Sequence, residues 1–343
     1  MLMLASLAVI SCKKDSGGPD GDIASGLHVQ DGKFLVDKCG NKVVLRGVNM
    51  GSVYAANFGL KELEEIEKTG ANTVRVVLER GYKDWTNGGA LTPLTEAKIE
   101  PVITSCIGKG MIPVLELHDF TGTANVVADL PKAVQWWSSQ GIKAMLQKYQ
   151  KSIIINIANE PDNGSVSDAS YAEANTSAVK ALRDAGYTCP IMIDAPSWGK
   201  DHVFFLYKGQ GLMDADPLHN LLFSVHAYWP TNGPFGNYSD AKITADFAAM
   251  KEKNLPVVIG ELAMADIQNG LVYNINYRLL MKLCRENEFG YIAWWWGFNN
   301  NPGANNQLSM TNDGLYSGLA GAGKVIAVDD VNSIKNSAKR ICQ

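Results

Sequence analysis

Two glutamates each follow a short, β-branched, apolar run of the sequence. Glu160 ends the segment IIINIANE (153–160), and Glu261 ends the segment PVVIGE (256–261). Two carboxyl groups about 5–5.5 Å apart can hydrolyse a glycosidic bond with retention of configuration. One attacks the anomeric carbon, while the other protonates the leaving oxygen and then deprotonates water. Glu160 and Glu261 are therefore the candidate catalytic pair.

Other polar and aromatic residues stand at the ends of similar runs. A single polar group in this position is more often a helix cap or a satisfied structural group. A whole set is harder to explain, because an apolar core gains no stability from gathering polar groups. The set comprises Arg75, His118, Asp119, Asn159, Asp194, His226, Tyr228 and Trp294.

Some members of this set suggest a role beside the glutamates. Arg75 near Glu261 would hold that carboxylate ionised by charge pairing. Tyr228 could donate a hydrogen bond to the same carboxylate. Asn159 suits the sugar 2-hydroxyl, a contact that strengthens in the transition state. A tryptophan from the run that contains Trp294 would form an apolar floor under the sugar ring.

The elements that must position these residues repeat along the chain. Candidate strands cover 43–49, 73–78, 112–118, 153–159, 190–194, 222–226, 256–261 and 291–296. Helical patterns lie between them, including 60–68, 133–149, 172–185 and 274–285. This alternation predicts a parallel sheet covered by helices.

Repeats of about 30–40 residues fit a (β/α)8 TIM barrel, in which chemistry sits at the C-terminal ends of the strands. The alternative is an open doubly wound sheet, but no Gly-rich phosphate loop follows the first strand. Residues 27–42 read as a small β-hairpin with turns at Asp31-Gly32 and Gly40-Asn41, which would plug the barrel floor. Residues 328–342 read as a final helix.

The N-terminus predicts export. Residues 1–10 are apolar and shorter than the roughly 20 residues that span a bilayer. They lead into Ser11-Cys12, which resembles a bacterial lipoprotein signal with Cys12 as the lipid-anchored residue. The alternative is an ordinary hydrophobic N-terminus with a chance cysteine. We expect a signal over 1–12, a flexible tether over 13–25, and a catalytic barrel over 26–343, acting as a monomer.

The charge balance and the cysteines exclude other classes. The 343-residue chain has 31 basic and 35 acidic residues, a net charge of −4, which is not the pattern of a nucleic-acid binder. Six cysteines are present without a CxxC pair, so a structural zinc site is not expected. With Cys12 lipidated, an odd number remains, and at least one cysteine is unpaired. Sequence alone does not assign the pairs.

The segments that end in the two glutamates resemble the active-site motifs of glycoside hydrolase family 5. The resemblance rests on Asn159-Glu160-Pro161 and Ile259-Gly260-Glu261, each after a β-run, and it extends from about residue 27 to the C-terminus. The remaining matches to the family's active-site positions are Arg75, His118, His226, Tyr228 and Trp294. The resemblance implies that Glu160 is the acid/base, that Glu261 is the nucleophile, and that the chemistry needs no metal or other cofactor.

Longer stretches look like the bacterial β-mannanase branch of that family. They cover 115–122, 153–160, 182–186, 193–199, 214–226 and 293–296. This likeness places Asp119 and Trp198 in the substrate cleft. The chain departs from the branch at Pro161-Asp162-Asn163, where an aromatic residue is usual, and at Trp295, where a small residue is usual.

The favoured function is a retaining endo-β-1,4-mannanase acting on a plant-type polysaccharide. An endo-β-1,4-glucanase is the main alternative, because the family also contains cellulases with the Asn-Glu-Pro form. Two further hypotheses are a non-catalytic carbohydrate-binding lipoprotein and an exo-acting glycosidase. Trp229 is a candidate sugar platform on the loop after a strand. Trp136-Trp137 is expected to pack in the core, and the polar loop 299–306 would shape one cleft wall.

Overall fold

The fold is built around a closed barrel of eight parallel strands. The computed structural model describes residues 25–84, 89–234, 236–297 and 308–342. The barrel order is β10-β11-β14-β3-β4-β7-β8-β9, so each strand lies beside its neighbour in the chain. The strands are β3 (Arg46–Met50), β4 (Thr73–Leu78), β7 (Ile112–Leu117), β8 (Ile154–Asn156), β9 (Ile191–Asp194), β10 (Leu221–His226), β11 (Val257–Ala263) and β14 (Gly290–Trp294). Each overlaps a predicted segment, and the predicted TIM barrel is confirmed.

The barrel strands are buried on both faces, which explains their apolar character. Every residue of β4 and of β7 is buried. Arg75 and Glu116 are the charged exceptions within these two strands. A charge in a fully buried strand requires a buried partner, and the charged groups of Arg75 and Glu116 lie 3.6 Å apart.

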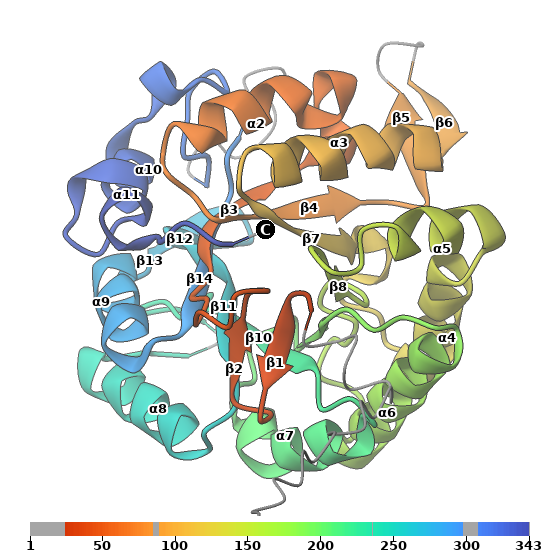
Figure 1. Cartoon of the computed structure of the whole chain (residues 1–343). Coiled ribbons are helices and arrows are strands. Elements are labelled where there is room, and N and C mark those ends of the chain that lie inside the picture. The colour runs from red at the N-terminus through yellow and green to blue at the C-terminus, as the bar shows by residue number, and fades with distance from the viewer. Residues whose placement is uncertain (1–24, 85–88, 235, 298–307, 343) are drawn as a thin grey trace, which may run out of the picture.

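Helices form a ring outside the strands (Figure 1). They are α2 (Leu60–Glu67), α3 (Glu96–Gly108), α4 (Val126–Trp137), α5 (Gln140–Gln147), α6 (Asp168–Asp184), α7 (Val203–Ala215), α8 (Asp240–Glu252) and α9 (Tyr277–Asn287). The single helix predicted over 133–149 is wrong. The segment forms two helices, α4 and α5. The backbone of Ser139, the N-cap of α5, is extended, with φ −61° and ψ 145°, and this interrupts the helix.

The predicted N-terminal hairpin is confirmed as β1 (His28–Gln30) and β2 (Phe34–Val36). Its turn residues Asp31 and Gly32 both have positive φ, 53° and 66°, as a type I′ turn requires. The hairpin lies across the end of the barrel where the strands begin (Figure 1). Leu27 N–H donates to the carbonyl of Lys151, shortly before β8, and Val29 N–H donates to Asn220, just before β10. The hairpin therefore covers the barrel floor.

Two further hairpins extend from the opposite end of the barrel. β5 (Gly81–Asp84) pairs with β6 (Ala90–Pro93) after β4, and β12 (Ala265–Gln268) pairs with β13 (Leu271–Asn274) after β11. The sequence did not predict either hairpin. The helix expected over 274–285 begins later, at Tyr277, because Asn274 still belongs to β13 and Asn276 caps the helix through its side chain.

The C-terminal segment differs from the helix predicted over 328–342. A π-helix covers Val325–Asp329, a single turn α11 covers Ile334–Ser337, and residues 338–342 are irregular. The short helices α10 (Gly321–Lys324) and η5 (Tyr316–Gly318) precede them. A disulfide between Cys39 and Cys342 joins this tail to the N-terminal region, and Cys342 N–H donates to Asp37 at 2.9 Å. Ile326 and Ala327 of the π-helix and Ile334 of α11 are buried in the core, and the disulfide and the Asp37 hydrogen bond hold the irregular end of the chain.

The other cysteines of the described residues are buried thiols. They are Cys106, Cys189 and Cys284, and burial raises the pKa of each to about 12. No helix among the described residues has the length and apolar character needed to cross a membrane. The signal expected over 1–12, nearly all of the tether expected over 13–25, and the loop 299–306 lie outside the described residues.

Candidate active site

The two candidate glutamates meet at the end of the barrel where the strands finish. Glu160 follows β8, and Glu261 lies near the end of β11. One carboxylate oxygen from each and a ring nitrogen of His226 all lie within 4.8 Å of one another. This separation suits the retaining mechanism, in which the two carboxyl groups stand about 5–5.5 Å apart.

Glu261 is held through both of its carboxylate oxygens. Arg75 Nη1 donates to Oε1 at 3.0 Å, and the Tyr228 hydroxyl donates to Oε2 at 2.6 Å. Burial raises the pKa of Glu261, and the Glu160 charge acts in the same direction against His226, Arg75 and Tyr228. Burial also raises the pKa of Tyr228, so its hydroxyl remains a donor. Both predicted contacts to Glu261 are present, although the net pKa shift is upward.

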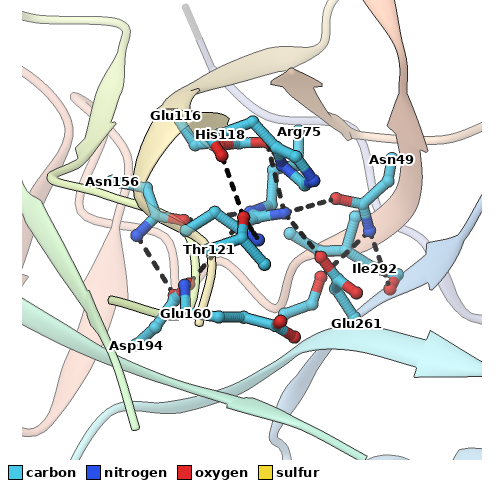
Figure 2. A network of polar contacts seen from close by, with 12 residues as sticks. Asn49, Arg75, Glu116, His118, Thr121, Asn156, Glu160, Asp194, Glu261 and Ile292 are labelled. Carbon is cyan, nitrogen blue, oxygen red and sulfur yellow. Dashed lines mark hydrogen bonds and ion pairs between the residues drawn. The ribbon is translucent and has the colours of Figure 1, made fainter. Parts of the chain in front are cut away.

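Arg75 is fully buried at the centre of a polar network (Figure 2). Its guanidinium donates to the side-chain oxygens of Asn156 at 2.9 Å, Asn49 at 3.0 Å and Asn159 at 2.6 Å. It also pairs with Asp194 at 3.3 Å and lies 3.6 Å from Glu116. Burial opposes the charge, but the surrounding carboxylates raise the pKa of Arg75 overall. A rigid, five-donor cation with this many acceptors fixes several strand ends at once.

Glu160 is fixed by its backbone as well as by its side chain. Its N–H donates to Asp194 Oδ2 at 3.1 Å, and its φ is +41°, a value that residues other than glycine rarely adopt. His226 Nδ1 lies 2.7 Å from Glu160 Oε1. Backbone strain of this kind persists where the surroundings impose it, and it gathers at functional sites.

His226 lies among three acids. Its ring nitrogens are within 3.6 Å of carboxylate oxygens of Glu160, Glu261 and Asp194. Burial alone would lower the pKa of His226, but Glu261 and Asp194 outweigh it and raise the pKa to about 10. His226 and Arg75 in turn hold the pKa of Asp194 far below its usual range, although burial opposes them. His226 is therefore a cation at neutral pH and donates to Glu160.

His118 and Trp294 form a second predicted part of the site. Their rings are stacked, with centroids 5.8 Å apart and planes at 8°. His118 Nδ1 lies 3.0 Å from Glu116 Oε1, and this partner raises the pKa of His118 although burial opposes it. The peptide bond between Trp294 and Trp295 is cis.

Asp119 and Trp198 lie on the loops around the barrel mouth. Asp119, in the 3₁₀ turn η4 (His118–Phe120), accepts from Arg80 N at 2.9 Å and from Arg80 Nε at 3.2 Å. Trp198 follows β9 and is 43% exposed. The arrangement leaves the indole of Trp198 open to solvent, whereas the Asp119 carboxylate is already bound by Arg80.

The suggestion that Trp229 is a sugar platform is wrong. Its ring is fully buried, stacks on Tyr238 with centroids 5.5 Å apart, and donates from Nε1 to Lys200 O at 3.3 Å. Trp137 is fully buried and donates to Ile157 O, which confirms that it is a core residue.

Sequence reasoning missed several members of the polar network. They are Asn49, Glu116, Asn156 and Thr121, and Asp194 was noted only as a strand end. Asn49, Glu116, Asn156 and Asp194 each interrupt a strand that is buried throughout. A polar residue inside a doubly buried parallel strand was the available signal.

Glu160, His226 and Glu261 are also close enough to share a metal ion. A histidine must be neutral to ligate a metal, whereas the acids around His226 raise its pKa to about 10. With no metal ion bound, the raised pKa of His226 favours donation of a hydrogen bond to Glu160.

Comparisons with known proteins agree with this geometry. The family model for cellulases (glycosyl hydrolase family 5) matches residues 36–300. A mannan endo-1,4-β-mannosidase of Cellvibrio japonicus is 31% identical over 92% of this chain and 69% of its own length. A similar enzyme of Streptomyces lividans is 32% identical over 84% of this chain and 70% of its own length.

A solved structure is similar over nearly its whole length. The catalytic domain of a mannanase from Streptomyces sp. SirexAA-E superposes with a TM-score of 0.78, 29% identity, and 98% of each chain covered. The family model covers most of the chain. The structure contains the closed barrel and the pair of carboxylates at its mouth that a retaining glycoside hydrolase needs. The chain therefore belongs to glycosyl hydrolase family 5, and it is a retaining glycoside hydrolase.

Proposed function

We propose that the protein is an endo-acting β-1,4-mannanase. The observation that carries this proposal is the closely spaced pair of Glu160 and Glu261, with both oxygens of Glu261 held by Arg75 and Tyr228. The substrate is suggested by the relatives, whose names describe mannan endo-1,4-β-mannosidases. A Thermomonospora fusca β-mannanase with 28% identity and a TM-score of 0.76 has been solved with mannohexaose.

In the first step, a carboxylate oxygen of Glu261 bonds to the anomeric carbon of the sugar. The bond from that carbon to the leaving oxygen breaks, and the proton of Glu160 passes to this oxygen. The product is a glycosyl ester on Glu261 together with a free chain end. Arg75 and Tyr228 support this role because each donates a hydrogen bond to one oxygen of Glu261, and together these bonds fix the orientation of the carboxylate.

In the second step, Glu160 takes a proton from water, and the water oxygen attacks the same carbon. The ester bond breaks and Glu261 regains its electron pair. Two inversions leave the configuration unchanged. His226, which is cationic at neutral pH and donates to Glu160 at 2.7 Å, orients this carboxyl group for both transfers.

The residues around the pair suit a pyranose ring. Trp294 offers an apolar face beside His118, and its ring is only partly buried. The Asn159 amide donates one hydrogen to Thr121 at 2.9 Å. Its second hydrogen is suited to a sugar hydroxyl, because an amide nitrogen carries two donors.

A substrate panel tests this function. Purified protein is incubated with galactomannan, glucomannan, carboxymethylcellulose, lichenan and xylan, and the products are followed over time by chromatography. We expect a ladder of mannooligosaccharides from the two mannans. Release from the glucans alone would favour the cellulase alternative, release of single sugars from the start would favour exo action, and no release would contradict the proposal.

We also infer that the protein is exported and anchored by lipid at Cys12. This rests on the apolar residues 1–10 followed by Ser11-Cys12. In a bacterial host, the protein should partition into the detergent phase and incorporate labelled fatty acid. A Cys12→Ser variant should do neither, and equal partitioning of the two proteins would contradict the anchor.

A further inference from the structure

An exposed tryptophan stands on a strained turn after β9. Trp198 is 43% exposed and has φ +54°, and Ser197 before it has φ +57°. Side chains other than glycine rarely adopt this left-handed region, and two in succession need outside support. A strained backbone that presents a large apolar ring to solvent is a feature of ligand-binding sites.

Asp162 supplies that support. Its Oδ2 accepts hydrogen bonds from Ser197 N at 2.9 Å and from Gly164 N at 2.8 Å. Its backbone carbonyl accepts from Trp198 N at 2.8 Å. Both amides of the strained turn are therefore bound by one fully buried residue.

The same residue is joined to the candidate acid/base. The Asp162 N–H donates to the Glu160 carbonyl at 2.7 Å, and the Gly122 N–H donates to that carbonyl at 2.8 Å. A Cβ on Gly122 would lie 2.4 Å from Nε1 of Trp198, so the indole packs directly on this glycine. The loops after β7, β8 and β9 thus meet at the backbone of Glu160, and Asp162 joins that backbone to the turn that carries the exposed ring.

The side chain of Asp162 accepts hydrogen bonds through only one of its two oxygens. Its second oxygen, Oδ1, is buried and has no hydrogen-bond partner among the described residues. An unpaired buried acceptor is destabilising. Asp162 binds the amide of Ser197 through its side chain and the amide of Trp198 through its backbone carbonyl, while Oδ1 stays unpaired. These contacts suit a residue that positions the loop after β9.

The strand order places Trp198 on the leaving-group side of the bond. It follows β9, which pairs with β8, the strand that leads to Glu160. Trp294 lies on β14, across the barrel from β8. With the attacked ring over Trp294, the leaving oxygen faces Glu160, and the sugar beyond that oxygen reaches the side of Trp198.

We propose that Asp162 is a positioning residue that fixes Trp198 as the platform for the sugar on the leaving side of the cleaved bond. This inference rests on the proposed function, because it assigns the second half of the same substrate. The ligand is a β-linked pyranose whose apolar face stacks on the indole.

The test compares two substrates that differ in their leaving groups. Mannohexaose places sugars on both sides of the cleaved bond, whereas β-mannobiosyl fluoride carries a single fluorine atom in place of the leaving sugar and needs little acid assistance. Trp198→Ala and Asp162→Ala should each lower kcat/KM for the hexaose by about tenfold, mainly through KM. Both should remain within about twofold of wild type on the fluoride, which leaves the side of Trp198 empty.

Two further variants separate positioning from general stability. Asp162→Asn keeps an acceptor oxygen for Ser197 and Gly164 and should retain near wild-type activity on the hexaose. Asp37→Asn weakens a similar buried acceptor, which binds backbone amides of Cys39, Asn41 and Cys342 at the barrel floor. It should lower thermal stability without changing the ratio between substrates. If Asp162→Ala does not fold, Asp162→Ser takes its place.

The double variant Asp162→Ala/Trp198→Ala gives the decisive comparison. If Asp162 acts through Trp198, the double variant should be no worse on the hexaose than either single variant. Equal losses on both substrates, or additive losses on the hexaose, would overturn the inference. A wild-type protein that cleaves neither substrate would instead count against the proposed function.

Discussion

The Tyr228 hydroxyl donates a 2.6 Å hydrogen bond to Oε2 of Glu261, and this contact joins the loop after β10 to the end of β11. Burial and the neighbouring acids raise the pKa of Tyr228, so the phenol stays protonated. A carboxylate that attacks carbon must present one lone pair in a fixed direction. The hydrogen bond from the tyrosine fixes that direction.

Replacing Glu261 by Ala should lower turnover of an activated aryl glycoside by roughly a thousandfold or more, because the nucleophile is lost. Added azide should restore activity by attacking the anomeric carbon directly, giving a glycosyl azide of inverted configuration. Glu160→Ala is the matched control, since azide should there release the ester on Glu261 and give the retained configuration. Product stereochemistry by NMR checks both, and the same anomer from both variants would contradict the assigned roles.

Replacing Tyr228 by Phe should lower kcat by roughly tenfold to a hundredfold, with a smaller change in KM. The ring is kept and only the hydrogen bond to Glu261 is lost. Tyr238→Phe serves as the control, because Tyr238 is a partly buried tyrosine that stacks on Trp229. Steady-state kinetics on one mannan oligosaccharide compares the two variants. Equal kcat in wild type and Tyr228→Phe would show that the hydrogen bond does not steer the nucleophile.

The charge on His226 should make stability depend on pH. Its folded pKa of about 10 lies above the ordinary value of 6.5. The folded protein holds this proton more tightly than the unfolded chain does, so the stabilisation is complete below pH 6.5 and disappears as the pH rises through 10. The free energy of unfolding of wild type minus that of His226→Gln should therefore shrink over this range.

Urea denaturation at several pH values measures that difference. His219→Gln, at an exposed histidine, is the matched control for the substitution itself. A wild-type advantage over His226→Gln that grows with rising pH would contradict a cationic His226.

Opening the disulfide should lower stability without lowering activity. The bond between Cys39 and Cys342 spans a sequence separation of 303 residues, and removing a native disulfide typically costs about 2–5 kcal/mol. Cys342→Ser should melt several degrees lower than wild type in a thermal scan. Its kcat/KM at 25 °C should be unchanged, because the bond lies near the floor and Glu160 and Glu261 lie at the mouth. Reductant should destabilise wild type but leave Cys342→Ser unaffected.

Much of the fold was predictable because its signal is local. Apolar β-branched runs alternate with helical patterns, and a doubly buried parallel strand must be apolar throughout. The mistakes occurred where a distant contact or a single extended residue overrides the helical pattern. The helix expected over 328–342 is replaced by a tail held by Asp37 and Cys39, and the helix expected over 133–149 is divided at Ser139.

The sequence by itself determined the barrel and the candidate pair, because a carboxylate that ends a barrel strand must face the mouth. Only the tertiary structure decided which groups surround that pair. Glu116 and Asp194 contact Arg75 through strands that are far apart in sequence, and Trp229 points into the core rather than toward the substrate. The direction of a side chain in a closed barrel depends on strand register and on neighbouring loops, and these are set by pairing across the whole chain.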